Sequence, residues 1–403
     1  MPELRRELAV VAQDPRYGGG FRSLAAEFWR AAGALGRDPR LYYLSRGAMT
    51  SIVGRTLRVA EHEETQGDFA GTAFPSLLPE LDAFNQLTGG ARMARRLRRE
   101  STVWVVAASA PYGYAALRSG RPYACWLATG LESEWAGRRD GLEPLRRIAL
   151  AVNAPVLRRL ERTVIRNAAA VYSISPASTR TLAEAGGIPP ERVRILPIPV
   201  DLERFAPEPD EVWQRRLEQP TLVFVGRPND PRKNLRLLLR AFPRVRERVP
   251  GLRLLIVGTQ SRRRKQPEDR LTAELRHLSS PGVEWLGGVP SVGDVLRSAT
   301  MLVLPSLQEG FGIVVAEALA SGVPAMVTPC GGPEDLIRDS RGGVLLASFR
   351  VSELTERLID VLGDEARLLR MRASGRAFVE REHSPERLRE LLGAAFAELE
   401  AVR

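Results

Sequence analysis

The sequence is poor in the residues that build metal centres and disulfide frameworks. Of its 403 residues only two are cysteines, Cys125 and Cys330, and they stand far apart. This spacing predicts two reduced thiols rather than a disulfide framework or a zinc site. The three histidines, His62, His277 and His383, show no metal-ligand spacing. We therefore predict that no metal centre is built from these side chains.

Long apolar runs are also missing. No run of about 18 uncharged apolar residues occurs, so we expect no membrane-spanning helix. The first residues, MPELRRELAVVAQDP, lack the apolar core of a secretory signal, which predicts a cytoplasmic protein. The composition, 44% hydrophobic and 27% charged, is typical of a soluble globular chain. Its length suffices for two domains with full cores.

Lysine is nearly absent, because Lys233 and Lys265 are the only two and arginine supplies most of the net charge of +11. The first 200 residues hold 28 arginines against 19 acidic residues. Three interpretations remain open: nucleic-acid binding, contact with an anionic lipid or phosphorylated substrate, and a coding bias toward arginine. No zinc-finger, homeodomain or RNA-recognition signature occurs, so we predict no nucleic-acid partner. The helical run ARMARRLRRES (91–101) is either a solvated helix face or a contact with an acidic membrane surface at the inner membrane face.

Short apolar runs alternate with helical segments in both halves of the chain, which indicates parallel sheets covered on both faces by helices. We predict an α/β fold with two doubly wound Rossmann-like domains that face a cleft. The strand candidates of the first half are residues 4–15, 38–45, 55–61, 102–109, 122–129 and 169–175. Those of the second half are residues 221–227, 252–259, 283–288, 301–306, 323–329 and 342–347, with a helix over 234–249 among them.

The proline-rich stretch 195–211 suits a hinge, and it divides the chain into domains 1–198 and 199–382. Residues 383–403 are predicted to form one final helix. Ligands of open α/β sheets collect at the carboxyl ends of the strands. With two such sheets, the expected site is the cleft between them.

The stretch PSLQEGFGIVVAEALASGVPAMVTPCGGPEDL (305–336) combines features of opposite electrostatic preference. A strand-like run leads to Glu309, then to the turn Gly310-Phe311-Gly312, and then to a helical segment that contains Glu317. Such a turn directs backbone N–H groups and the positive end of a helix dipole at one place, which suits an anion. The two carboxylates would repel that anion, unless they bind neutral groups beside it, such as sugar hydroxyls.

Two further loops follow predicted strands. The stretch FVGRPNDPRKNLRLLLRAF (224–242) places Arg227 and Lys233 between a strand and a helix. Two cations there suit a diphosphate, although solvated loop cations are the alternative. The stretch RYGGGFRS (16–23) would allow close backbone approach to a ligand, or it is only a structural turn. It is not the GxGxxG fingerprint of dinucleotide-binding proteins.

Together these motifs resemble a known family. Glu309 and Glu317, eight residues apart around EGFG and followed by ALASGVP, look like the E-x7-E element of retaining glycosyltransferases with the GT-B fold, of the family four type (glycosyl transferases group 1). The VGR…K stretch, the first-strand glycine loop and VYSIS (171–175) follow the order that the family shows. The resemblance covers nearly the whole chain, most firmly from about 220 to 345, and it does not specify a substrate.

The resemblance implies a role for each matching position. Glu309 would bind hydroxyls of the transferred sugar, and Glu317 the ribose hydroxyls of the nucleotide. Arg227 and Lys233 would neutralise the diphosphate leaving group. The remaining donor contacts would come from backbone at Gly19, Gly20, Gly288, Val289, Gly310, Phe311 and Gly312. By the same resemblance, domain 1–198 would bind the acceptor, domain 199–382 the nucleotide sugar, and the final helix would pack back on the first domain.

Two positions depart from the family pattern. Thr129-Gly130 stands where family members often have a His-Gly pair, so the acceptor side is built differently; we assign Thr129 and Glu132 to it. The alternative interpretation is that Glu132 and the neighbouring Glu134 are exposed surface carboxylates with no role in binding. The hinge sequence LPIPVD (196–201) replaces the Asn-Gly that usually precedes Val-Asp. Both departures point to an unusual acceptor or donor sugar.

The predicted function is a retaining hexosyltransferase that moves a sugar from a nucleotide-diphosphate sugar to an unidentified acceptor. The positive charge favours a phosphorylated or lipid-linked acceptor. The resemblance implies front-face chemistry without a protein nucleophile. No Asp-x-Asp metal signature occurs, so we expect no divalent metal and no other cofactor. The alternatives are a glycoside phosphorylase or nucleotide-sugar epimerase of the same fold, and a non-catalytic basic binding protein.

Overall fold

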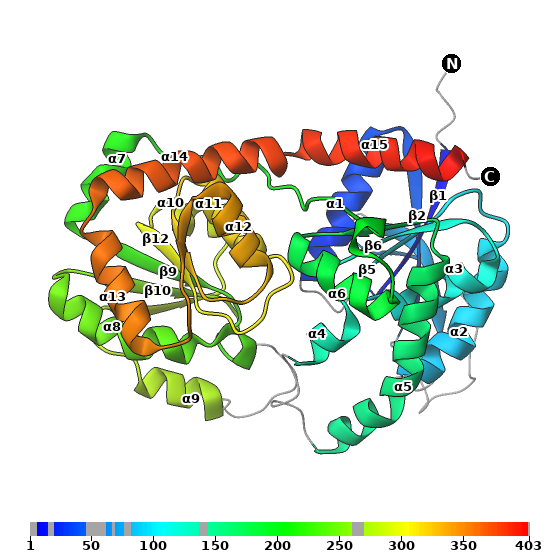
Figure 1. The fold of residues 1–403 in the computed structure, drawn as a ribbon, viewed down its shortest axis with the longest axis horizontal. Helices are drawn as coiled ribbons and strands as arrows, with labels where there is room; N and C mark the ends of the chain where they lie inside the picture. Colours follow the sequence, from blue (N-terminus) through cyan, green and yellow to red (C-terminus); the bar gives the residue numbers. More distant parts are fainter. Residues whose placement is uncertain are drawn as a thin grey trace. The chain divides into compact units, whose positions relative to one another are not determined.

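The computed structural model describes residues 6–14, 20–45, 62–66, 69–75, 82–136, 144–259 and 270–401. The chain forms two compact units (Figure 1). Unit 1 consists of Met1–Ile198 together with Pro385–Arg403, and unit 2 consists of Pro199–Ser384. Each unit is built around its own sheet, and each is described by itself below.

Unit 1 contains an eight-stranded sheet in the order β3-β4-β2-β1-β5-β6-β7-β8. Its neighbouring strands pair in parallel except for β3 and β4, which form an antiparallel pair at one edge. All five residues of β5 and of β6 are buried, as expected for central parallel strands covered on both faces. The strands are β1 (Arg6–Ala12), β2 (Arg37–Ser45), β3 (His62–Gln66), β4 (Phe69–Pro75), β5 (Val103–Ala107), β6 (Tyr123–Leu127), β7 (Ala170–Ser173) and β8 (Val193–Ile195).

The helices of unit 1 include the last helix of the chain, α15 (Pro385–Ala401), which packs beside α1 (Figure 1). The Phe396 ring of α15 lies 6.1 Å from the Phe28 ring of α1 and 5.3 Å from the Trp104 ring of β5. An ion pair of 2.5 Å between Arg37 Nη1 and Glu400 Oε1 adds a polar contact. The helices are α1 (Gly20–Ala34), α2 (Asp82–Leu97), α3 (Tyr114–Ser119), α4 (Leu131–Ala136), α5 (Pro144–Asn167), α6 (Pro176–Gly186) and α15, with 3-10 turns η2 (Ala110–Gly113) and η4 (Pro190–Arg192).

Unit 2 contains a six-stranded parallel sheet in the order β11-β10-β9-β12-β13-β14. The chain builds outward from β9 to β10 and β11, and then returns to place β12 on the other side of β9. The order therefore reverses between β9 and β12, and ligands of open α/β sheets bind at such a switch point. The strands are β9 (Thr221–Val225), β10 (Arg253–Val257), β11 (Val283–Gly287), β12 (Met301–Leu304), β13 (Ala325–Val327) and β14 (Gly343–Leu345).

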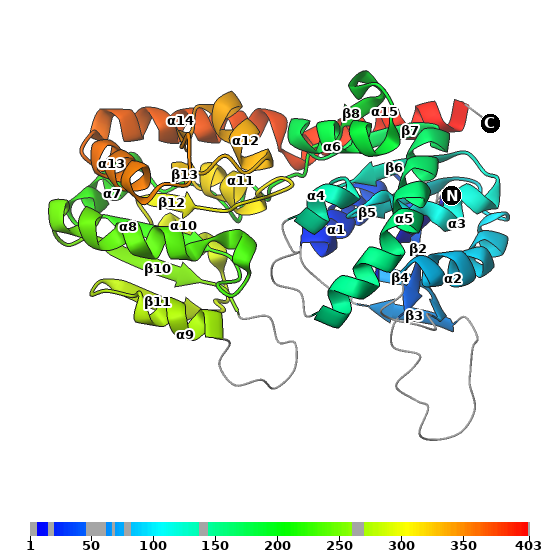
Figure 2. The ribbon, with the colours of Figure 1, turned by 60° about the horizontal axis from the view of Figure 1, so that its bottom comes forward.

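Helices cover the sheet of unit 2 through apolar faces. Helix α8 buries Leu235, Leu238, Leu239, Phe242 and Val245, a spacing of three and four residues that puts them on one face. Helix α8 packs along α13, and α14 packs on α11 and α12 (Figure 2). The helices are α7 (Asp210–Gln214), α8 (Leu235–Arg248), α9 (Arg270–His277), α10 (Val292–Arg297), α11 (Ile313–Ala320), α12 (Gly332–Ser340), α13 (Val351–Leu362) and α14 (Glu365–Glu382), with 3-10 turns η5 (Arg215–Glu218) and η6 (Pro231–Lys233).

The predicted fold class is confirmed, since two parallel-strand sheets each carry helices between successive strands. The strands β3, β4 and β8 were not predicted, because HEETQ is polar, FAGTAFP contains a glycine and ends in proline, and VRI is only three residues long. The strand predicted over 55–61 lies outside the described residues. The glycine loop was predicted too long, because α1 already begins at Gly20. The helical run 91–101 ends early, because α2 stops at Leu97.

Within the described part of the chain, no helix combines the length and the apolar composition needed to span a bilayer.

Candidate functional site

Two loops meet at the switch point of unit 2. One follows β9 and carries Arg227 and Lys233, and the other follows β12 and carries Glu309. The strands β9 and β12 are paired neighbours, so their carboxyl ends lie side by side. A backbone hydrogen bond of 2.7 Å from Leu307 N–H to the Arg232 carbonyl joins the loops directly. The topology therefore brings together residues that are about 80 positions apart in the sequence.

The loop after β9 is shaped by Asp230. Its carboxylate accepts a hydrogen bond from the Arg232 N–H at 3.1 Å and so caps the 3-10 turn η6. The turn ends at Asn234, which has a left-handed conformation with φ of 46° and leads into α8. An aspartate that binds the backbone two residues onward is a frequent turn former. This local geometry sets the directions in which the cations of the loop can point.

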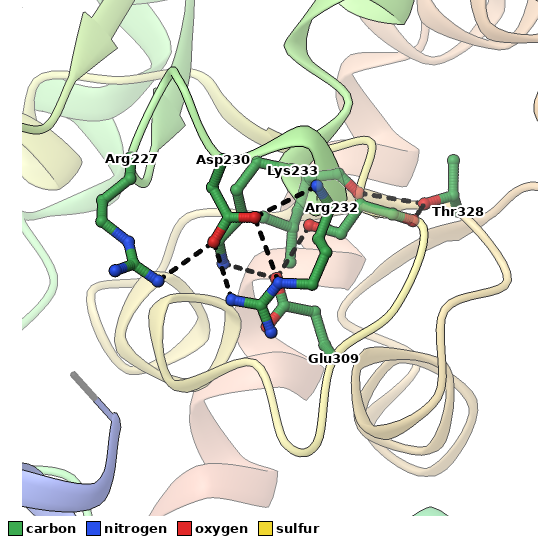
Figure 3. Close-up of polar contacts among 8 residues, drawn as sticks. Arg227, Asp230, Arg232, Lys233, Glu309 and Thr328 are labelled. Atoms are coloured by element: carbon green, nitrogen blue, oxygen red, sulfur yellow. Dashed lines mark hydrogen bonds and ion pairs between the residues drawn. The ribbon is translucent and has the colours of Figure 1, made fainter. Parts of the chain in front are cut away.

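Asp230 also pairs with two arginines (Figure 3). Its Oδ2 lies 3.0 Å from Arg227 Nη2 and 2.7 Å from Arg232 Nη2. Burial alone would raise the pKa of Asp230, but the Arg232 hydrogen bond and the charges of both arginines outweigh it and lower the pKa. The Arg227 side chain is 45% exposed and that of Arg232 17%. Arg227 is therefore the cation of this pair that a ligand can reach from solvent.

Glu309 and Lys233 form an ion pair of 2.5 Å between Oε1 and Nζ (Figure 3). The Ser306 hydroxyl donates a hydrogen bond of 2.8 Å to the same carboxylate oxygen. The backbone of Glu309 is held as well, because its N–H donates to the Cys330 carbonyl at 2.7 Å. The sequence assigned Lys233 and Glu309 to different parts of a ligand, and the structure places them in direct contact.

The glycine turn after Glu309 is tightly packed. Gly312 has φ of 82° and precedes the first turn of α11, and a Cβ there would lie 2.6 Å from Pro333 Cγ. The Phe311 side chain is buried, with its ring 5.1 Å from the His383 ring. Phe311 therefore supplies packing through its side chain, and only its backbone could face a ligand. The first N–H groups of a helix such as α11 have no helical acceptor.

Glu317 lies on α11, one helix turn and a half beyond Gly312. Burial raises the pKa of its carboxyl group to about 7, and the charge of Arg204 opposes this shift. No described residue donates a hydrogen bond to the Glu317 carboxyl group. A half-buried carboxyl group of this kind is suited to accept hydrogen bonds from a ligand.

Gly288 and Val289 directly follow β11, the edge strand of the sheet. Gly288 is exposed and Val289 is half-buried. A Cβ at Gly288 would lie 2.6 Å from Thr259 Cγ2, so this backbone approaches the loop after β10 closely. The two residues are at the same carboxyl edge as Arg227, two strands away from β9.

The remaining predicted residues belong to unit 1. Gly20 begins α1, and Gly19 lies outside the described residues. Thr129 is buried, with Oγ1 3.4 Å from Thr181 Oγ1. Glu132 forms an exposed ion pair with Arg158.

Sequence reasoning missed four residues of this site: Asp230, Arg232, Ser306 and Thr328. The Asp-Pro pair at 230–231 was an available turn signal. No local signal marks Ser306 or Thr328, because the Thr328 hydroxyl reaches the Ser306 carbonyl only through the pairing of β12 with β13. Among the described residues, no group of three or more His, Cys, Asp or Glu side chains could hold a metal ion.

Two family models match the chain. The model described as "Glycosyl transferases group 1" matches residues 219–364, and the one described as "Glycosyltransferase Family 4" matches residues 42–204. Together they cover more than half of the sequence. The first lies within predicted domain 199–382, and the second covers most of predicted domain 1–198 and ends shortly after its boundary.

Curated relatives carry related names. A D-inositol 3-phosphate glycosyltransferase of Nocardia farcinica is 32% identical over 62% of this chain and 58% of the relative. A GDP-mannose-dependent alpha-(1-6)-phosphatidylinositol monomannoside mannosyltransferase of Mycolicibacterium smegmatis is 30% identical over 55% of this chain and 60% of the relative. The matched part thus spans somewhat more than half the length of these two relatives.

Solved structures share the fold over nearly the whole chain. Sucrose-phosphate synthase from Thermosynechococcus elongatus superposes with a TM-score of 0.75 at 18% identity, covering 99% of this chain and 100% of that one. The Anabaena protein HepE in complex with UDP superposes with a TM-score of 0.71 at 16% identity, covering 97% and 99%. At such low identity these structures bear on the fold alone.

Proposed function

We propose that this chain, which belongs to the glycosyltransferases of the GT-B fold, transfers a hexose from a nucleotide-diphosphate sugar with retention of configuration. The observation that carries the proposal is at the switch point of unit 2, where the loop that holds Arg227 and Lys233 meets the loop that holds Glu309. The two cations can pair with the diphosphate of a donor, and the carboxylate can accept hydrogen bonds from the hydroxyls of its sugar. The relative named as GDP-mannose-dependent supports a nucleotide-sugar donor.

In this proposal the cations act on charge that develops during the reaction. As the bond between the anomeric carbon and the diphosphate oxygen breaks, negative charge grows on the leaving diphosphate. Arg227, exposed beside Asp230, and Lys233, whose ammonium group has three donors, stabilise that charge. The acceptor hydroxyl attacks the same face of the sugar and passes its proton to the departing diphosphate oxygen, so no protein nucleophile is needed. We propose that the cations replace a divalent metal in this role.

The carboxylates and backbone groups hold the neutral parts of the donor. Glu309 accepts hydrogen bonds from sugar hydroxyls, beside the backbone of Gly310, Phe311 and Gly312. Glu317 accepts hydrogen bonds from the ribose hydroxyls. The backbone of Gly288 and Val289 faces the base. The assignment of Gly19 and Gly20 to donor binding stays a prediction from the sequence. Each charge-assisted hydrogen bond contributes roughly 1.5–3 kcal/mol.

We propose an acceptor that contains a phosphorylated inositol, either free or as a lipid headgroup. The names of both curated relatives contain such a group. The excess of arginine over acidic residues in the first 200 residues suits an anionic acceptor. Thr129 and Glu132 are assigned to the acceptor side. The test is transfer of a radiolabelled sugar to inositol phosphate against transfer to phosphatidylinositol vesicles, with unphosphorylated inositol as the control.

A lipid acceptor would place the enzyme at the inner membrane face, and unit 1 has a surface that suits such contact. Ile148, Val152 and Val156 are exposed along α5 at intervals of four residues, and Phe84 and Leu87 are exposed on α2, which packs against α5. Exposed arginines continue both helices, namely Arg92, Arg95, Arg159 and Arg162. Apolar and basic side chains together favour an anionic lipid surface.

Co-sedimentation with vesicles tests this contact. We expect binding to anionic vesicles that falls as salt rises, and weak binding to neutral vesicles. Val152→Ser should weaken binding, whereas Val212→Ser, which changes an equally apolar exposed residue of unit 2, should not. Equal binding of both variants and the unaltered protein would remove the α5 face from this role.

The donor is tested by calorimetric titration with UDP, GDP, ADP and inorganic phosphate, each with EDTA present. We expect one nucleoside diphosphate to bind without a metal, which would also identify the donor base. Binding of phosphate alone would favour a glycoside phosphorylase. Binding of none of the four would favour a non-catalytic basic protein.

A further inference from the structure

The two oxygens of the Glu309 carboxylate have different surroundings. Oε1 accepts from Lys233 Nζ at 2.5 Å and from the Ser306 hydroxyl at 2.8 Å. No described residue donates a hydrogen bond to Oε2. The Glu309 side chain is 16% exposed, so it is not sealed in the core. One oxygen is therefore used within the protein, and the other remains available to a ligand.

Ser306 is more deeply buried than Glu309. It lies just after β12 and is 0% exposed. Its carbonyl accepts a hydrogen bond of 2.5 Å from the Thr328 hydroxyl, and Thr328, also 0% exposed, follows β13 directly. Because β12 and β13 are paired, this bond ties Ser306 to the sheet. The Ser306 hydroxyl is thus a donor in a fixed position, aimed at Glu309 Oε1.

The two donors on Oε1 have different freedom of movement. Lys233 has a flexible stem, and its ammonium group can turn toward a phosphate while it keeps contact with the carboxylate. The short Ser306 side chain has one torsion between its backbone and its hydroxyl oxygen. When a diphosphate attracts Lys233, Ser306 remains the donor that keeps Oε1 in place and Oε2 turned toward the ligand.

We propose that Ser306 is a positioning residue that orients Glu309 so that Oε2 accepts a hydroxyl of the donor sugar. This inference rests on the proposed function, since it requires Glu309 to bind that sugar. It assigns to Ser306 no contact with the nucleotide. The expected consequence is a selective loss of affinity for the sugar moiety, while affinity for the nucleoside diphosphate is kept.

The test measures the dissociation constants of a nucleoside diphosphate and of its sugar conjugate by calorimetry. The quantity of interest is the ratio of the two constants, conjugate over diphosphate. In Ser306→Ala we expect this ratio to rise roughly tenfold, the effect of one hydrogen bond to a charged group. Ser340→Ala is the matched control, because Ser340 is also a buried serine of unit 2 that bonds to backbone. Its ratio should equal that of the unaltered protein.

The remaining outcomes are distinct. An unchanged ratio in Ser306→Ala overturns the inference, as does an equal loss of affinity for both ligands, which would indicate a general disturbance of the site. Retained binding of the diphosphate shows that unit 2 of the variant is folded. If the unaltered protein binds neither ligand, the proposed function fails, and that result is separate from a failure of Ser306.

Discussion

Glu309 and Arg227 lie in the same site, yet they are expected to act on different parts of the donor. Glu309→Gln keeps the size of the side chain and removes the charge that pairs with Lys233. We expect this variant to lose sugar transfer by at least about a hundredfold, the loss typical when a group that stabilises the transition state is removed. Nucleoside diphosphate affinity should change little. Initial rates and calorimetry on the same preparation would show this separation, and equal losses in both would contradict it.

Arg227→Ala should instead weaken binding of the diphosphate itself. Loss of one charge-assisted contact of roughly 1.5–3 kcal/mol corresponds to a ten- to hundredfold rise in Kd. Arg236→Ala is a suitable control. Arg236 lies on α8, is exposed to a similar extent as Arg227, and pairs with Glu274 of α9. Unchanged affinity in Arg227→Ala would remove Arg227 from the diphosphate site.

Glu317 should make donor binding depend on pH. Burial raises the pKa of its carboxyl group to about 7, so in the free protein the group is partly protonated at neutral pH. Ribose hydroxyls donate to the ionised form, so bound nucleotide favours ionisation. Affinity for the nucleotide should therefore rise as pH increases from about 6 to about 8. The reason is that a smaller fraction of the free protein then carries a protonated Glu317 that must lose its proton on binding. The rise should vanish in Glu317→Gln, and an equal slope in that variant would assign the pH dependence to another group.

At the scale of elements, the turn that joins β12 to α11 depends on one glycine. Gly312 has φ of 82°, and a Cβ would lie 2.6 Å from Pro333 Cγ at the start of α12. Gly312→Ala should cost at least about 1–2 kcal/mol, from the left-handed backbone conformation alone. It should also displace the α11 N-terminus and weaken nucleotide binding.

Thermal unfolding and calorimetry would measure both effects of Gly312→Ala. Gly363→Ala is the control, because Gly363 has φ of −85° and a Cβ there would be 3.5 Å from its nearest neighbour, an ordinary contact. A Gly312→Ala protein with unaltered stability would show that the turn accommodates a side chain, contrary to its packing against Pro333.

Elements with strong internal patterns could be predicted from the sequence. The buried runs of β9 and β12 and the apolar face of α8 were each visible in a short window. The strand β3 could not be predicted, because its residues are polar and its pairing with β4 comes from the tertiary structure. The hydrogen bond between Ser306 and Thr328 could not be predicted either, because the two residues are 22 positions apart and meet only in the tertiary structure.

At the scale of the whole molecule, the last helix returns to the unit that contains the N-terminal strands. Phe396 of α15 is buried against Phe28 and Trp104. Phe396→Ala should destabilise unit 1 by about 3–5 kcal/mol, the usual cost of removing a buried aromatic ring. Because the proposed diphosphate contacts all lie within Pro199–Ser384, nucleotide binding should persist below the transition temperature.

Scanning calorimetry with and without nucleotide would test this separation. Phe349→Ala, which truncates an exposed phenylalanine of unit 2, is the control and should change stability by less than about 0.5 kcal/mol. A loss of nucleotide affinity in folded Phe396→Ala protein would show that the donor site depends on unit 1 packing.

The sequence by itself determined the fold class and the types of residue available for chemistry. The reason is that buried parallel strands and amphipathic helices have local periods, and that glycine turns and loop cations follow strands directly. Only the tertiary structure decided which of these groups touch. It paired Lys233 with Glu309, set Asp230 between two arginines, and placed the Ser306 hydroxyl on one carboxylate oxygen. The Lys233–Glu309 contact depends on strand order in the sheet, because its partners are distant in the chain and have no local period to reveal them. The contacts of Asp230 and Ser306 join near neighbours and depend on how each loop turns.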